Sequence, residues 1–154
     1  MSALDNSAAN DVPTQTQQRG NGNCPGKSKW SAVLSSSGIT LNNFHPSGVR
    51  DNADPKKQVE AAAQGHEAER SSYGTAPGGS TCLSTRLADF LLKLGQQYGG
   101  VTVNSIAGAD HSRGSSHYRG TTIDVGALKG RRLDDAEMAQ LVVNTCVLDM
   151  GGRA

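Results

Sequence analysis

His117 and Asp124 lie seven residues apart, in a segment that also contains serine, glycine and a short run of strand-forming residues. Imidazole nitrogen and carboxylate oxygen both bind zinc at roughly 2.0–2.2 Å, and a catalytic zinc takes three protein ligands and a water molecule. These two residues therefore predict a zinc site of hydrolase type, and a third ligand must come from elsewhere in the chain.

The residues around Asp124 predict how the pair is brought together. Residues 121–125 are rich in threonine, isoleucine and valine, which favour a strand. Side chains alternate along a strand, so Ile123 and Val125 should face the core and Asp124 should point away from it. An odd spacing would put His117 and Asp124 on opposite faces of a flat strand. The chain must therefore turn or bulge between them, and Gly120 is the expected place.

Ser115, His117, Gly120 and Asp124 together spell Ser-x-His-x-x-Gly-x-x-x-Asp. This pattern resembles the first zinc motif of the D-alanyl-D-alanine carboxypeptidase and dipeptidase family of peptidoglycan peptidases, whose fold is shared by the amino-terminal domain of Hedgehog proteins. The resemblance covers about half of the chain. It implies that His117 and Asp124 bind Zn²⁺, and that the substrate is a stem peptide of peptidoglycan.

The second motif of that family carries the third ligand and the general base, and it is missing from this sequence. No histidine follows Asp124, and no general base is found. The resemblance therefore predicts a domain that is incomplete at its carboxyl end. Two function classes follow: a zinc peptidase completed by other residues, and a non-catalytic zinc- or peptide-binding module of the same fold.

Other residues near the motif are candidates with ordinary alternatives. His111 is a possible third ligand, although a solvated loop histidine is the more common situation. Arg113 and Arg119 are candidate substrate-binding residues, because guanidinium pairs with carboxylate in bidentate fashion; plain surface charge is the alternative. Ser115 is a candidate for contacting substrate or holding the motif loop. His117 and Asp124 themselves have an alternative as a hydrogen-bonded pair without metal.

Composition limits the function classes and the domain organisation. The 154 residues suit one ordinary domain with a tail. Residues 1–27 are rich in Ser, Asn, Gln, Thr and Gly, which predicts a disordered tail or linker before a zinc peptidase-like domain over residues 28–154. A net charge of +1 argues against a nucleic-acid binder, and no stretch is long and apolar enough for a transmembrane segment.

Whether the three cysteines form a disulfide depends on the compartment in which the protein works. Cys24, Cys82 and Cys146 have no short metal-binding spacing. The resemblance implies an extracytoplasmic protein, secreted or periplasmic, although no signal peptide is visible. In that setting a Cys24–Cys82 disulfide is expected, since it would tie down the less regular amino-terminal half. Three free thiols in a reducing compartment are the alternative.

The hydrophobic pattern predicts an α+β fold with a small sheet and flanking helices. The resemblance implies that the sheet is antiparallel and that the fold is Hedgehog/DD-peptidase-like. Helices are predicted over residues 54–70, on the surface, over residues 84–98 with one apolar stripe, and from Asp134-x-x-Glu137 onward. Strands are predicted over residues 29–33, 39–44, 101–106 and 121–125.

Overall fold

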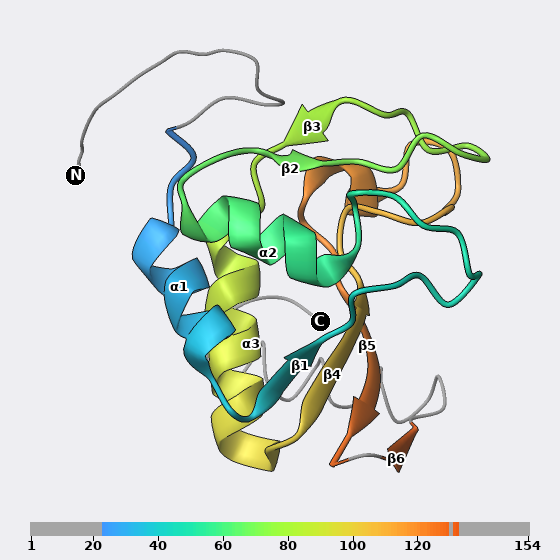
Figure 1. Cartoon of the computed structure of the whole chain (residues 1–154). Coiled ribbons are helices and arrows are strands. Elements are labelled where there is room, and N and C mark those ends of the chain that lie inside the picture. The colour runs from blue at the N-terminus through green and yellow to red at the C-terminus, as the bar shows by residue number, and fades with distance from the viewer. Residues whose placement is uncertain (1–22, 130, 133–154) are drawn as a thin grey trace.

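The computed structural model describes residues 23–129 and 131–132, and these form an α+β fold (Figure 1). The described helices are α1 (Lys27–Ser35), α2 (Pro55–Ala63), α3 (Thr85–Tyr98) and the short 3-10 helix η1 (Ser116–Arg119). The described strands are β1 (Ile39–Leu41), β2 (Ala68–Glu69), β3 (Ser80–Thr81), β4 (Val101–Ser105), β5 (Asp124–Leu128) and β6 (Arg131–Arg132).

The main sheet is mixed, with the strand order β1-β4-β5-β6. β1 pairs parallel with β4, whereas β4–β5 and β5–β6 are antiparallel. The prediction of an antiparallel sheet is therefore wrong at β1. The chain between β1 and β4 passes through α2 and α3, and such a long crossover allows the second strand to run in the same direction as the first. β2 and β3 form a separate antiparallel pair.

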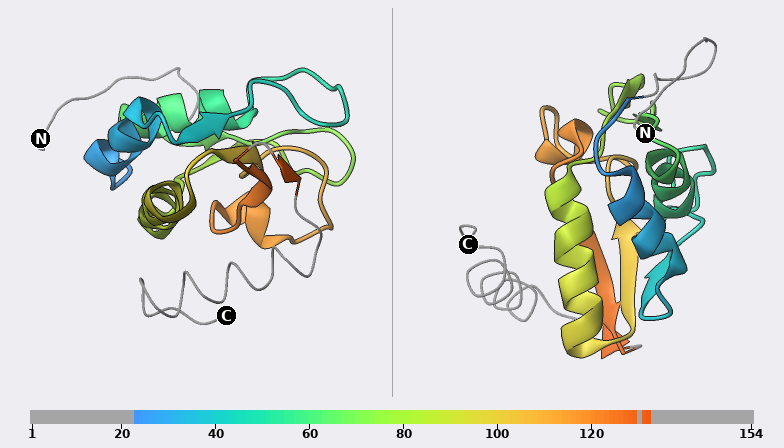
Figure 2. Two further views of the ribbon diagram at one scale, coloured as in Figure 1. Left: turned by 90° about the horizontal axis from the view of Figure 1, so that it is seen from below. Right: turned by 90° about the vertical axis from the view of Figure 1, so that its left-hand side faces the viewer.

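Helix α3 has the sequence features of a helix that packs on a core. Leu87, Leu91 and Leu94 form its buried stripe, and the Ser84 side chain caps its first turn by accepting a hydrogen bond from the backbone N–H of Arg86. The helix predicted over residues 84–98 is confirmed, one residue later at its start. Figure 2 shows α3 lying along the sheet, with α1 beside it.

Helix α1 corrects the strand predicted over residues 29–33. Trp30 and Val33 are fully buried and lie three residues apart, which places both on one face of a helix. In a run this short, a helix with two buried positions and a buried strand have similar sequence patterns.

Helix α2 is shorter and less exposed than predicted. It begins at Pro55 after the Asp54 cap, as expected, but ends at Ala63, because Gly65 with φ 81° turns the chain away. Its alanine-rich side does not lie on the surface: Val59 and Ala62 are buried. Helix α1 packs against it.

Three strand predictions remain, over residues 39–44, 101–106 and 121–125. β1 and β4 confirm the strands predicted around residues 39–44 and 101–106, whereas β5 begins only at Asp124 and residues 121–123 lie outside it. The predicted carboxyl-terminal helix lies outside the described residues. None of the helices in residues 23–129 has the length and apolar character needed to cross a bilayer.

A disulfide joins Cys24 to Cys82, with their Cα atoms 5.5 Å apart, as predicted. It links the segment before α1 to the segment before α3. This bond indicates an oxidising environment and contradicts the alternative of three free thiols. Cys146 lies outside the described residues.

Candidate metal centre

The candidate site lies where the loops that follow β1, β2 and β4 gather with η1 (Figure 1). Gly120 ends η1 with φ 72°, in the left-handed region, and returns the chain toward β5. A Cβ atom at this position would lie 2.5 Å from the carbonyl oxygen of Cys82, so only glycine fits. The predicted irregularity at Gly120 is confirmed. Ser115 caps η1 by accepting a hydrogen bond from the backbone N–H of His117.

His117 is buried and its ring orientation is fixed. Its Nδ1 atom lies 2.6 Å from the carbonyl oxygen of Ile106, which can only accept a hydrogen bond. Nδ1 therefore carries the proton of the neutral ring, and the lone pair of that form is on Nε2, which faces Asp124. A metal-binding histidine is commonly held by a backbone carbonyl in this manner.

Asp124 is held by the pairing of β4 with β5, in which it lies opposite Ser105. The Ser105 hydroxyl donates a 2.8 Å hydrogen bond to Oδ2 of Asp124. The other oxygen, Oδ1, lies 3.4 Å from Nε2 of His117. Because the Asp124 side chain is 53% exposed, the cluster is open to solvent on this side.

His111 joins the same cluster from the loop after β4. Its ring stacks on that of His117 with the centroids 3.6 Å apart and the planes 2° from parallel. The ligand atoms of His111, His117 and Asp124 all lie within 4.8 Å of one another, so the three residues form a possible metal-binding group. The alternative of a solvated loop histidine does not describe the position of His111.

The donor set, and the spacing of His117 and Asp124 within it, fit a tetrahedral metal such as zinc. With metal–ligand bonds of about 2.0–2.1 Å, neighbouring ligand atoms lie about 3.3 Å apart. The 3.4 Å between His117 Nε2 and Asp124 Oδ1 matches this distance, and it is longer than the roughly 2.7–2.9 Å of a charge-assisted hydrogen bond. Two imidazoles on one tetrahedral ion have centroids about 5 Å apart, so the His111 ring must turn out of the stack to complete the set.

The surroundings shift the three pKa values in different directions. Burial lowers the pKa of His117, but the neighbouring carboxylate of Asp124 and the Ile106 carbonyl raise it above its usual 6.5 overall. Burial and the neighbouring His117 hold the pKa of His111 below 6.5. Burial raises the pKa of Asp124, yet His117 and Ser105 lower it below 3.8 overall. At neutral pH Asp124 is thus ionised and His111 neutral, the forms that bind metal.

The arginines predicted to bind substrate and the two remaining histidines are not members of this group. Arg113 is exposed, and Arg119 is exposed with its guanidinium donating to the carbonyl oxygen of Gly114. His45 is buried elsewhere and pairs with Asp51 at 2.6 Å. His66, half-buried after α2, is not part of the group.

Ser105 was missed from the sequence, although a signal was present. It continues the buried alternation of Val101 and Val103 along β4. A hydroxyl at a buried strand position needs a hydrogen-bond partner, and here that partner is the carboxylate of Asp124.

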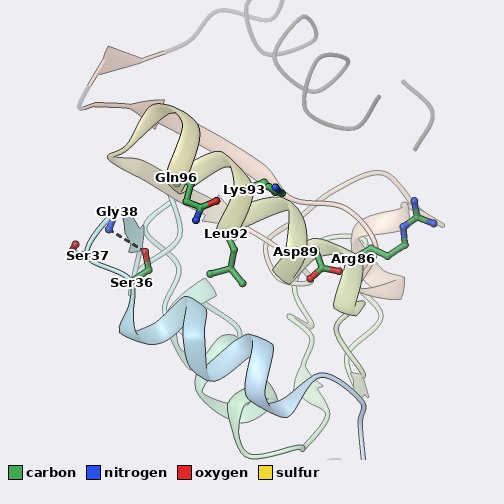
Figure 3. Close-up of a pocket in the computed structure, with 9 residues that line it drawn as sticks. Ser36, Ser37, Gly38, Arg86, Asp89, Leu92, Lys93 and Gln96 are labelled. Carbon is green, nitrogen blue, oxygen red and sulfur yellow. Dashed lines mark hydrogen bonds between the residues drawn. The ribbon is translucent and has the colours of Figure 1, made fainter. Parts of the chain in front are cut away.

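A pocket elsewhere on the surface lies between α3 and the turn before β1 (Figure 3). It is lined mostly by polar side chains, including Arg86, Asp89, Lys93 and Gln96. None of the residues that line it belongs to the candidate metal group.

No family model, curated protein or solved structure matches this chain.

Proposed function

We propose that this chain is a zinc-dependent peptidase-like domain that hydrolyses an amide bond in peptidoglycan stem peptides, of the D-Ala-D-Ala type or a related one. The observation that carries the proposal is the convergence of His111, His117 and Asp124. Two imidazoles and one carboxylate are a donor set of catalytic zinc in peptidases. The substrate class comes from the resemblance of residues 115–124 to the carboxypeptidase motif.

The chain's own residues prepare the site for this chemistry. The Ile106 carbonyl keeps the proton of His117 on Nδ1, and the Ser105 hydroxyl leaves Oδ1 of Asp124 available. When bound, zinc polarises a scissile carbonyl and lowers the pKa of its water to about 7. The exposed side of Asp124 admits a peptide.

The exposed guanidinium groups beside η1 suit the far end of such a substrate. Arg113 lies in the loop that leads into η1, and Arg119 is the last residue of η1. A stem peptide ends in a carboxylate, which a guanidinium binds in bidentate fashion. In the proposed complex these arginines hold the terminal carboxylate. The Cys24–Cys82 disulfide supports a secreted or periplasmic location, where peptidoglycan is found.

One observation favours a second candidate, a non-catalytic zinc- or peptide-binding module of the same fold. Within the described residues the group contains a single carboxylate, Asp124, and the metal would use it. Hydrolysis also requires a general base to accept a proton. The enzyme therefore needs a base that the three-residue group does not supply, whereas a binding module does not.

Peptide release distinguishes the two candidates. The zinc-loaded protein is incubated with a synthetic stem pentapeptide ending in D-Ala-D-Ala and with isolated peptidoglycan, and products are identified by mass spectrometry. A peptidase releases D-Ala or a cleaved stem, the His117→Ala variant does not, and the control variant His66→Ala does. Absence of release at full zinc occupancy would reject the peptidase and favour the binding module.

A further inference from the structure

The loop that carries His111 is fixed by side chains from other parts of the chain. The most central of these is Tyr118, which is buried in η1. Its hydroxyl accepts a 2.5 Å hydrogen bond from the backbone N–H of His111. The same hydroxyl lies 3.2 Å from the carbonyl oxygens of Ala109 and His111, to which it can donate.

The loop residue before His111 is held as well. The backbone N–H and the hydroxyl of Thr75 both donate to Oδ1 of Asp110 at 2.9 Å, and the hydroxyl also contacts the carbonyl oxygen of His111. These bonds connect the loop after β2 to the loop after β4. The His111 backbone is therefore held at both its N–H and its carbonyl.

A buried polar network holds the loop on its other side. The Ser71 hydroxyl accepts a hydrogen bond from the backbone N–H of Ala109 and donates to Asp51, which pairs with buried His45. Ala109 has φ 70°, a conformation that a residue with a side chain adopts only when its surroundings enforce it. The loop therefore has one enforced backbone conformation, whereas the His111 ring is held by its stack on His117 and by a 3.4 Å contact of its Nε2 atom with the Ser105 hydroxyl.

Tyr118 differs from the other anchors because it follows the proposed ligand His117 directly. Its own carbonyl oxygen accepts a 2.6 Å hydrogen bond from Nε of Arg70, which fixes η1 to the segment after β2. One short helix thus carries one ligand and the anchor of another.

We propose that Tyr118 is a positioning residue that fixes the backbone of His111, so that this histidine reaches the metal by turning its ring alone. The inference rests on the proposed zinc site. A ligand on an unfixed loop loses conformational freedom when metal binds, and a ligand on a fixed loop loses much less, so affinity rises. Groups that hold metal ligands typically contribute 10–100-fold to metal affinity.

A double-mutant cycle on zinc affinity tests this inference. The zinc dissociation constants of the full chain and its variants are measured by competition with a chromophoric chelator. Tyr118→Phe keeps the ring and removes the hydroxyl, and zinc binding should weaken about tenfold. The matched control is Tyr98→Phe, whose hydroxyl contacts Gln97 on α3, and it should leave the affinity unchanged.

The cycle separates positioning from a general structural effect. In a His111→Ala background no ligand remains for Tyr118 to position, so adding Tyr118→Phe should change the affinity by less than about twofold. Equal weakening in both backgrounds would overturn the inference, as would an unchanged dissociation constant in Tyr118→Phe. If the unaltered chain binds no zinc, the proposed function fails and the inference with it. If the unaltered chain binds zinc and Tyr118→Phe leaves the dissociation constant unchanged, only the inference about Tyr118 is overturned, and the proposed zinc site stands.

Discussion

His111 and His117 stack on each other beside one carboxylate, with opposite consequences for their protonation. Asp124 contacts His117 directly and raises its pKa above 6.5, whereas burial and the charge of His117 lower the pKa of His111. In the metal-free protein, one proton is therefore held preferentially on His117. Zinc must displace that proton, so zinc affinity should fall as the pH is lowered through the pKa of His117.

In the metal-free protein His111 and His117 should titrate at separate pH values. NMR of the imidazole resonances should place the pKa of His117 above 6.5 and that of His111 below it. Asp124→Asn should lower the pKa of His117, while the control Asp89→Asn, which changes an acid paired with Lys29 on the surface, should not. Equal pKa values for the two rings, or a His117 value unmoved by Asp124→Asn, would contradict the pairing in the structure.

The same pair gives a signed dependence of stability on pH. A histidine whose pKa is raised in the folded state stabilises the fold fully below pH 6.5, and this contribution is lost as the pH rises through the folded-state pKa. Asp124, whose pKa is lowered in the folded state, stabilises the fold above about pH 3.8, and this contribution is lost as the pH falls through the folded-state pKa. Asp124→Asn should therefore destabilise the metal-free protein more at pH 5.5 than at pH 8.5 in urea titrations. A larger loss of unfolding free energy at pH 8.5 than at pH 5.5 would contradict the stabilising pair of His117 and Asp124.

Ser105 should matter for the metal through the two proposed ligands that its hydroxyl contacts, Asp124 at 2.8 Å and His111 at 3.4 Å. Ser105→Ala removes the hydroxyl that orients the carboxylate, and zinc affinity should fall about tenfold. Ser35→Ala removes a hydroxyl that bonds only within α1 and is the control. Chelator competition measures both, and equal affinities of Ser105→Ala and the unaltered chain would contradict the assigned role.

At the scale of elements, the turn after η1 determines how His117 faces Asp124. Gly120 and Gly114 both have positive φ, near 72° and 76°, but only Gly120 is crowded. Gly114→Ala should lower the free energy of unfolding by about 1 kcal/mol through backbone strain alone. Gly120→Ala adds a clash between the new Cβ atom and the carbonyl oxygen of Cys82, and it should lower the free energy of unfolding by about 3 kcal/mol or more. Equal losses in denaturant titrations would show that the close approach to Cys82 is absent.

The elements that the sequence predicts well are those with a complete local pattern. α3 has five buried apolar positions, a serine cap and a glycine end within one segment. β4 alternates buried and half-buried residues along its length. α1 has only Trp30 and Val33 as buried positions, so a helix and a buried strand were indistinguishable. The parallel pairing of β1 depends on contacts far along the chain, which no local pattern carries.

At the scale of the molecule, the possible metal-binding group combines two residues that the sequence motif contains with one, His111, that lies outside the motif. His117 and Asp124 were predicted because a motif of ten residues contains both. His111 is placed by Tyr118, Thr75 and Ser71, residues whose meeting depends on the tertiary fold. A lone loop histidine has the same local sequence whether or not such anchors exist. The sequence therefore offers His111 only as a candidate third ligand, with a solvated loop histidine as the alternative.

The disulfide should contribute to global stability. It links residues 58 positions apart, and the loop-entropy relation gives about 4 kcal/mol for a loop of that length. Replacing both Cys24 and Cys82 with serine should lower the free energy of unfolding by about 2–4 kcal/mol in urea titrations. A loss below about 1 kcal/mol would show that the bond does not restrict the unfolded chain as expected.

Zinc stoichiometry tests the central claim most directly. The metal-free protein is dialysed against buffered zinc, and bound metal per chain is measured by atomic absorption for the unaltered chain, for alanine variants of His111, His117 and Asp124, and for the control His66→Ala. The account predicts one zinc per chain in the unaltered protein and in His66→Ala, a weakened but measurable zinc affinity in His111→Ala, and loss of zinc in His117→Ala and Asp124→Ala. One tightly bound zinc retained in both His117→Ala and Asp124→Ala would contradict it.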